Sequence, residues 1–269
     1  MSETLTVESL AHATAKEVRQ LVREGKWTSS TSGLALGYAQ ANMIILPRDW
    51  AFDFLLYAQR NPKPCPLLEV TEAGDPETKI TAPGGDIRTD IPKYRVWENG
   101  VLVEEPTDIL HLWRDDLVAF MIGCSFSFEN ALLENGIGLR HVEENVTVPM
   151  FLTGVKCTPA GRFSGNMVMS MRPVPHEKVV KAVTCTALYP SVHGAPMHVG
   201  DPSAIGVKDI NKPEFGDGVT IKPGETPVFW ACGVTPQAAV MQSKPPFAIT
   251  HAPGHMFIVD KKDTDYAVF

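Results

Sequence analysis

The residues with the clearest chemical potential form the octet Gly123–Asn130, sequence GCSFSFEN, directly after the apolar run 117–122. Its reactive members are a thiol, two hydroxyls and a carboxylate, namely Cys124, Ser125, Ser127 and Glu129. A helix that starts at either serine would point free backbone N–H groups at the loop, and such groups bind anions, including carboxylates. The same field would lower the pKa of the neighbouring thiol. The octet therefore predicts a substrate site, or else a simple helix cap beside a packed cysteine.

Two further loops carry histidine, the side chain best suited to proton transfer near neutral pH. His193 and His198 share one loop with Asp201, and His251 and His255 share another. Each set could supply general acids and bases or metal ligands. The spacing matches no helical His-x-x-x-His motif, so a divalent metal is only weakly indicated and no cofactor is expected. The alternative is a surface loop with incidental histidines.

The segment Trp230–Pro236, sequence WACGVTP, repeats the order of the octet: a strand, a cysteine, a small residue and a helix start. Gly233 and Thr235 would form a second carboxylate cradle, with Thr235 as the N-cap. Arg162 and Arg172 could clamp a carboxylate through paired N–H groups. A well-capped helix and a hairpin with edge arginines are the corresponding structural alternatives.

The elements that must position these groups include both helices and strands. Helices are predicted over 7–24, from Pro47 to before Pro62, over 115–122, from the octet to Gly136, over 175–188 and after Thr235. Strands are predicted at 94–98 and 101–105 around Asn99-Gly100, and at 146–152, 167–171, 219–221, 228–230, 247–249 and 256–259. The segment 62–92 is rich in Pro, Gly and Asp and should be mostly loop. This mixture predicts an α/β or mixed α+β fold.

Composition excludes several functional classes. The chain has 269 residues, 44% of them hydrophobic, and a net charge of −7 without a basic cluster, so no nucleic-acid partner is expected. No apolar run approaches the ~20 residues that span a bilayer, and the N-terminus lacks a signal-peptide pattern, so we expect a cytoplasmic protein without a membrane partner. Five cysteines without a Cys-x-x-Cys pair argue against a disulfide framework. Nucleotide-binding and nucleophile-elbow motifs are absent.

Six motifs together resemble a bacterial hydro-lyase family that is similar to part of mammalian D-glutamate cyclase. They are GYAQAN (37–42), GCSFSFE (123–129), MSMRP (169–173), HGAPMHVGDP (193–202), CGVTPQ (232–237) and PGHMF (253–257). The resemblance implies a three-layer α/β main body, approximately 1–112 with 190–269, and a smaller two-layer α+β subdomain, approximately 113–189. It also implies loss or addition of water at a small carboxylate or amino acid, with interconversion of D-glutamate and 5-oxo-D-proline as one candidate reaction.

The roles we assign under this resemblance are specific. His193 or His198 would move protons, with Glu129 and Cys124 as the other catalytic candidates. The expected substrate-binding residues are Ser125, Ser127, Arg172, Gly233, Thr235, Gln40, Asn42 and His255. The sequence leaves open a cyclase, a dehydratase of hydroxy acids, and a non-catalytic binder of a small carboxylate or amino acid. A homo-oligomer is expected only on base rates, since most soluble oligomers are homo-oligomers.

Overall fold

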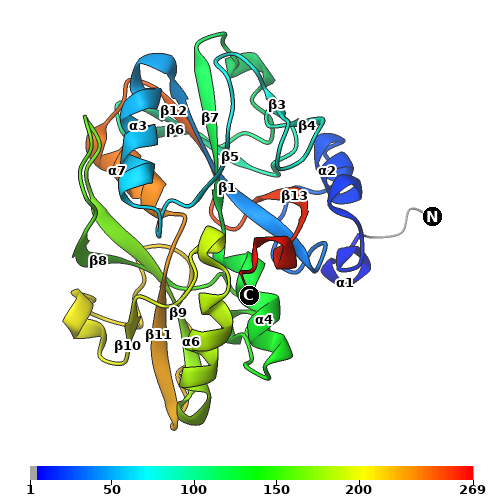
Figure 1. Cartoon of the computed structure of the whole chain (residues 1–269). Helices are drawn as coiled ribbons and strands as arrows, with labels where there is room; N and C mark the ends of the chain where they lie inside the picture. The colour runs from blue at the N-terminus through cyan, green and yellow to red at the C-terminus, as the bar shows by residue number, and fades with distance from the viewer. Residues whose placement is uncertain (1–4, 269) are drawn as a thin grey trace.

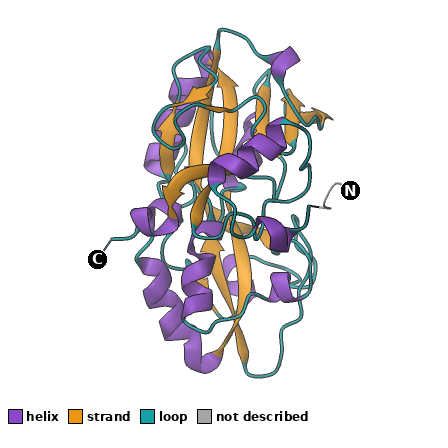
Figure 2. Cartoon of the chain, turned by 90° about the vertical axis from the view of Figure 1, so that its right-hand side faces the viewer, coloured by secondary structure: helices purple, strands orange, loops and turns teal. Residues whose placement is uncertain are grey.

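Two antiparallel sheets, one above the other, organise the chain in the computed structural model, which describes residues 5–268 (Figures 1 and 2). The larger sheet has the strand order β2-β7-β1-β12-β5-β6, and β13 pairs with β1 beyond the end of β12. Its strands are β1 (Tyr38–Pro47), β2 (Leu67–Val70), β5 (Tyr94–Glu98), β6 (Val101–Glu104), β7 (Leu117–Gly123), β12 (Ala248–His251) and β13 (Phe257–Lys262). The mixed α+β prediction is confirmed.

The smaller sheet has the order β10-β11-β9-β8. Its strands are β8 (Met150–Lys156), β9 (Asn166–Pro175), β10 (His198–Val199) and β11 (Glu225–Ala231). A separate two-stranded ribbon pairs β3 (Glu77–Thr78) with β4 (Gly85–Asp86) inside the segment predicted to be mostly loop. The strands predicted near 146–152, 167–171 and 228–230 are confirmed, whereas 219–221 forms no strand.

Seven α-helices and six short 3-10 helices connect the strands within residues 5–268. The α-helices are α1 (Val7–Leu10), α2 (Ala15–Arg23), α3 (Arg48–Arg60), α4 (Glu129–Glu134), α5 (Arg140–Glu143), α6 (Val179–Ala187) and α7 (Thr235–Ser243). The 3-10 helices are η1 (Leu110–Leu112), η2 (Ser125–Phe128), η3 (His176–Lys178), η4 (Pro190–Val192), η5 (Pro202–Ile205) and η6 (Asp263–Tyr266). None of the helices described is long and apolar enough to cross a membrane.

The central strand β1 is buried on both faces, which explains its continuous apolar sequence. Side chains alternate along a strand. Accordingly, Ile44 and Leu46 join one core cluster while Met43 and Ile45 join another. The first cluster also contains Met169 of the smaller sheet, so the two sheets share a core. Helices α3 and α7 both contribute buried residues to this cluster, and both lie to the left of β1 in Figure 1.

Two predicted helices are wrong, the continuous helix over 7–24 and the helix over 115–122 before the octet. The helix expected over 7–24 is interrupted, because Thr6 and Thr14 each begin a separate helix with a capping box. The helix expected over 115–122 is the strand β7, buried along its whole length. A short apolar run without a polar face fits a buried strand as well as a buried helix segment, and periodicity cannot separate them.

The hairpin prediction is confirmed. Asn99 and Gly100 have φ values of 50° and 79°, the left-handed pair that a type I′ turn requires between β5 and β6. A Cβ at Gly100 would lie 2.9 Å from the backbone oxygen of Met241, so the turn also packs closely against the end of α7.

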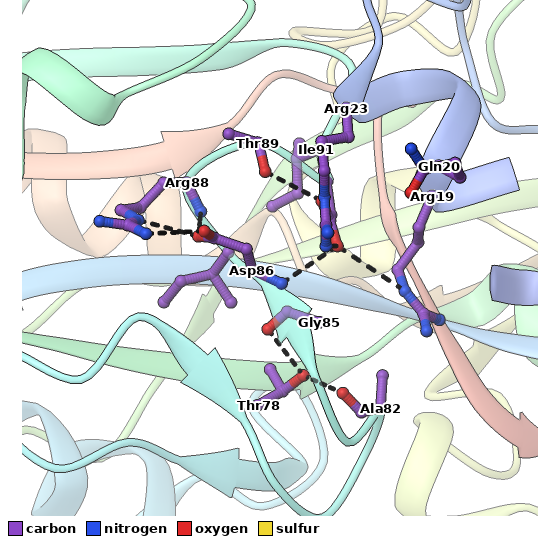
Figure 3. A network of polar contacts seen from close by, with 12 residues as sticks. Arg19, Gln20, Arg23, Thr78, Ala82, Gly85, Asp86, Arg88, Thr89 and Ile91 are labelled. Atoms are coloured by element: carbon purple, nitrogen blue, oxygen red, sulfur yellow. Dashed lines mark hydrogen bonds and ion pairs between the residues drawn. The ribbon is translucent and has the colours of Figure 1, made fainter.

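A polar network fixes α2 to the larger sheet and to the loop that follows β4 (Figure 3). Arg23 donates hydrogen bonds of 2.8 and 2.7 Å to both carboxylate oxygens of Asp90, which is buried. Asp90 also accepts a hydrogen bond from the Asp86 backbone N–H, and Arg19 lies 3.9 Å away and pairs with Asp260. The network therefore ties α2 to the β4 loop and to β13.

The chain passes between the sheets at two positions that carry candidate site residues. It leaves the larger sheet after Gly123 and returns to it after Ala231. The expected boundaries near 113 and 189 stay a prediction, but β7 lies in the larger sheet and β11 in the smaller one. We infer instead that the smaller unit spans residues 124–231, as an insertion within the larger one.

Candidate functional site

The octet begins where β7 reaches the junction of the two sheets. A Cβ at Gly123 would lie 2.2 Å from the Ser191 backbone oxygen, so only glycine allows the segment around η4 to approach this closely. The residue before η2 is Cys124, and no side chain caps this helix. Ser127 instead accepts a hydrogen bond of 3.0 Å from the backbone N–H of Gln40. Ser127 therefore links η2 to β1 and does not cap the helix.

Arg172 and Glu129 form a buried ion pair behind the octet. The Nε group of Arg172 donates to Glu129 Oε1 at 3.1 Å, and its Nη2 group donates to the same oxygen. Nη2 also donates to Ser125 at 3.3 Å, and Nη1 donates to Ser170 at 3.1 Å. His141 Nε2 lies 3.3 Å from Glu129 Oε1. Arg172 is 1% exposed, so these partners replace the water that would otherwise solvate its charge.

All the contacts of Glu129 converge on one carboxylate oxygen. Burial alone would raise the pKa of Glu129, but Arg172 and His141 outweigh it and hold that pKa below its ordinary value. Within residues 5–268, Oε2 accepts no hydrogen bond, yet it is not among the fully enclosed, unpartnered side-chain atoms. Glu129 lines a cavity of about 420 Å³. Oε1 is therefore held by the protein, and we infer that Oε2 is the oxygen that Glu129 presents to the cavity.

The two cysteines at the sheet junction are protonated thiols. Burial raises the pKa of Cys124 far above its ordinary value and that of Cys232 to about 11. The backbone N–H groups of Phe126 and Val234 act in the opposite direction but do not outweigh burial. The expected lowering of the Cys124 pKa is therefore wrong, because the protein around the thiol excludes water.

Asn42 joins the two junction segments. Its Nδ2 group donates a hydrogen bond of 2.8 Å to the Gly123 carbonyl, and a Cβ at Gly233 would lie 1.8 Å from the same nitrogen. Thr235 is not the N-cap of α7, which is Val234. Its hydroxyl instead donates to the Cys232 carbonyl at 2.7 Å and accepts from the backbone N–H of Val168. Both predicted cradle residues therefore contact protein.

We expect Gly233→Ala to destabilise the fold by about 1–3 kcal/mol, because the new methyl group would overlap the Asn42 amide. Urea unfolding followed by circular dichroism would measure the loss. Gly154→Ala is the matched control, since a Cβ there meets nothing closer than 3.6 Å. In the double variant with Asn42→Ala, the cost of the glycine change should shrink; equal costs with and without Asn42 would contradict the assigned overlap.

The predicted histidine pair does not meet. His193 is buried beside the octet, where Nδ1 bonds the Lys63 carbonyl at 2.8 Å and Nε2 has no partner among the described residues. Burial lowers the pKa of His193 to about 4, so it is neutral at pH 7. His198 pairs with Phe229 in β10 and β11, and its ring contacts that side chain. Arg172 is on the opposite face of this sheet, so His198 is separated from the cluster.

His255 lines a second cavity, of about 510 Å³, between the two units. The larger unit contributes Lys93, Arg95, Glu105, Ala252, Pro253 and His255, and the smaller unit contributes Thr147 and Glu214–Asp217. His255 Nδ1 lies 2.9 Å from the Pro253 carbonyl, whereas Nε2 makes no hydrogen bond among the described residues. Burial, aided by the nearby charges of Lys93 and Arg95, lowers the pKa of His255. We call this space the His255 cleft.

The basic residues of the His255 cleft were missed by sequence reasoning. Lys93 and Arg95 are two residues apart at the start of β5, and this spacing puts both on one face of the strand. Arg95 pairs with Glu105 across the hairpin at 2.9 Å, whereas no ion pair of Lys93 is found within residues 5–268. The i, i+2 spacing of two cations at the start of a predicted strand is the signal that could have found them.

Groups of three or more His, Cys, Asp or Glu side chains arranged to hold a metal are not found in the described part of the chain. His251 is buried, and its Nδ1 accepts a hydrogen bond of 3.1 Å from the Met43 backbone N–H. Its position beside β1 separates it from the loop of His193. The four candidate histidines thus occupy different environments and do not form one ligand set.

Comparison with known proteins gives consistent matches over the whole fold. A family model described as D-glutamate cyclase matches residues 118–260, a region that includes the octet, Arg172 and His255. A relative from Geobacillus kaustophilus is 59% identical over 258 residues, covering 96% of this chain and 98% of its own. One from Agrobacterium fabrum is 61% identical over 254 residues, covering 94% of both chains. One from Bacillus subtilis is 57% identical over 253 residues, covering 94% of this chain and 98% of its own. All three bear the name "Putative hydro-lyase".

A solved structure, a nitrogen repressor-like protein from Methanococcus jannaschii, aligns with 93% of this chain and 98% of its own at 10% identity. The TM-score is 0.37, which does not establish a shared fold.

Proposed function

Because this chain belongs to the D-glutamate cyclase family, we propose that it is a hydro-lyase that acts on a small carboxylate in the His255 cleft. The observation that carries the proposal is the combination of an uncharged histidine with two cations in one cleft of about 510 Å³. Removal of water from a carboxylate substrate needs both a proton acceptor and a positive anchor. The His255 cleft contains both on one wall.

The local geometry supports His255 as the general base. The Pro253 carbonyl can accept only from a protonated Nδ1, so the neutral ring carries its hydrogen there and its lone pair on Nε2. Since the pKa of His255 is lowered, this base is already free at pH 7. A base in its unprotonated form at the working pH is what proton abstraction requires.

Lys93 and Arg95 support binding of the substrate carboxylate. Lys93 has no ion-pair partner within residues 5–268, so its ammonium is available to an anion. Arg95 is already paired with Glu105 through Nε, which leaves its other N–H donors for a second interaction. A carboxylate held between these cations would lie in the same cleft as His255.

D-glutamate is the specific substrate that we propose, with 5-oxo-D-proline as the product. Its amine nitrogen attacks the side-chain carboxyl carbon, a C–N bond forms, a C–O bond breaks and one water leaves. His255 would take a proton from the substrate ammonium, which frees the attacking lone pair. This proton and the second one that the nitrogen loses as the amide forms go to the departing carboxylate oxygen, which leaves as water. The facing wall of the His255 cleft carries Glu214 and Asp217, whose negative charge suits the substrate ammonium. A hydroxy acid lacks this cation and would gain nothing from that wall.

This proposal gives the buried residues near the octet a structural role. Phe215 lines the His255 cleft and packs against a cluster that contains Cys232 and Val234. The junction segments therefore support one wall of the cleft. Cys124 stays protonated and His198 faces elsewhere, so neither is assigned a proton-transfer step here.

A proton NMR time course would test the proposed function. Purified protein would be incubated separately with D-glutamate, 5-oxo-D-proline and a panel of small hydroxy acids, with and without added divalent metal. We expect conversion between D-glutamate and 5-oxo-D-proline. An alkene signal from a hydroxy acid would replace the cyclase by a dehydratase. Line broadening of a carboxylate ligand without turnover of any compound would favour a binding protein.

We expect Lys93→Met to lower kcat/KM by about 10- to 100-fold, mainly through a higher KM. The reason is that a hydrogen bond to a charged group contributes about 1.5–3 kcal/mol. Steady-state kinetics with the substrate identified by NMR would measure it. Lys181→Met, on the exposed part of α6, is the control and should leave KM unchanged. An unaltered KM in the Lys93 variant would remove Lys93 from the substrate site.

A further inference from the structure

We propose that the cavity of about 420 Å³ beside Glu129 is a second ligand site that binds an alkylammonium ligand, an apolar chain with a cationic amine. We call it the Glu129 cavity. It lies between α1, the loop 32–38, η2, α4 and the α5 region. It shares no lining residue with the His255 cleft. The inference therefore does not depend on the proposed activity.

The walls of the Glu129 cavity are mainly aliphatic. Leu34, Phe126, Leu133, Leu139 and Val142 come from four different segments of the chain and face one space. Burial of an alkyl chain against such walls contributes about 25 cal/mol per Å² of apolar surface. A cavity with apolar walls and a few polar groups is the usual form of a small-molecule site.

The charge of the Glu129 cavity selects a cation. Its lining includes four carboxylates, those of Glu8, Glu129, Glu143 and Asp263, and no Lys, Arg or His. Two of these carboxylates are paired from outside the lining: Glu143 with Arg140 at 2.9 Å, and Glu129 with Arg172. An anionic ligand would meet net negative charge here. A cationic head group is favoured.

Glu129 supplies the specific contact. It is only 7% exposed, Arg172 donates to Oε1 alone and His141 also lies nearest to Oε1, so Oε2 is the oxygen left without a protein donor for a ligand in the cavity. A carboxylate oxygen in a largely apolar space needs a donor, because an unmade hydrogen bond to a charged group is costly. A primary ammonium has three donors and carries the complementary charge. The lowered pKa of Glu129 keeps its carboxylate charged for this contact.

Isothermal titration calorimetry on the full chain would test the site with n-hexylamine, 1-hexanol and hexanoate at pH 7. The three probes share one apolar chain and differ in the head group. We expect saturable binding of n-hexylamine, with 1-hexanol and hexanoate about tenfold weaker or more, because only the amine can make a charge-assisted bond with Glu129 Oε2. Equal affinity for n-hexylamine and 1-hexanol would overturn the proposal.

Variants would locate the binding. Leu133→Trp fills the cavity from its partly exposed rim and should abolish n-hexylamine binding, whereas Val180→Trp, on the 74% exposed position of α6, should leave it intact. Glu129→Gln keeps the shape and removes the charge, so the preference for n-hexylamine over 1-hexanol should disappear. Undiminished n-hexylamine binding in folded Leu133→Trp would place the ligand elsewhere and contradict the inference, even if Glu129→Gln proves too unstable to test.

Discussion

Replacement of His255 by glutamine should lower kcat by about 10²- to 10⁴-fold, the range that loss of a general base produces. Substrate binding should persist, because Lys93 and Arg95 remain in the His255 cleft. Single-turnover kinetics and a separate ligand titration would measure the two effects independently. His12→Gln, at an exposed position outside the cleft, is the control and should keep full activity.

The pH profile gives the same prediction a second test. The pKa of His255 is lowered below 6.5 in the folded protein, so the active, neutral form predominates at pH 7 and is lost as pH falls through the lowered pKa. The acid limb of kcat/KM should therefore lie below pH 6.5 and vanish in the residual activity of His255→Gln. A variant that keeps both its rate and its acid limb would show that another group carries the proton.

Replacement of Arg172 by methionine should destabilise the fold by about 3–5 kcal/mol, the second large effect that we expect. The cost arises because Glu129 would keep its buried carboxylate without the guanidinium that neutralises it. Urea unfolding at pH 7 would measure the change in the free energy of unfolding. Lys212→Met is the matched control, since the Lys212–Asp209 pair is exposed and surface pairs contribute only about 0–1 kcal/mol.

A double variant separates charge from packing. Arg172→Met with Glu129→Leu removes both charges, so it should recover part of the stability lost in Arg172→Met. The stability that Glu129 contributes through its lowered pKa is present above its unfolded pKa and is lost as pH falls through the lower, folded value. Wild type should thus lose this increment below about pH 4.5, whereas the double variant should not. If the destabilisation of the double variant equals the sum of the destabilisations of Arg172→Met and Glu129→Leu alone, the two charges are not coupled.

The local parts of the fold could be predicted because their causes are local. Asn99-Gly100 specifies its turn by backbone conformation alone, and Pro47 precedes α3 as expected. The strand β7 could not be assigned, since its apolar run lacks a polar face and only its position between β2 and β1 decides its conformation. Thr14 shows the opposite case: a local cap strong enough to divide a periodic segment into two helices.

The sequence predicted which residues belong to the candidate site better than it predicted how those residues are arranged in space. Ser125, Glu129 and Arg172 do meet at the junction of the sheets. Their connection brings η2 and α4 against β9, which lies more than 40 residues away in the chain, and no local pattern contains such a contact. The pKa of Cys124 was predicted in the wrong direction because burial, which sequence does not give, outweighs the backbone N–H that favours the thiolate.

The position of β1 also has a consequence for the order in which the chain is synthesised. One neighbour of β1 is β7, and the other side of β1 is completed only by β12 and β13, which end at Lys262. About 200 residues must be added in between, which takes roughly 10–40 s at a rate of 5–20 residues per second. During that interval an apolar edge of β1 lacks its final partners. The edge of β1 therefore stays open until the last strands leave the ribosome, and the smaller unit, inserted between them, is synthesised in full before that edge is covered.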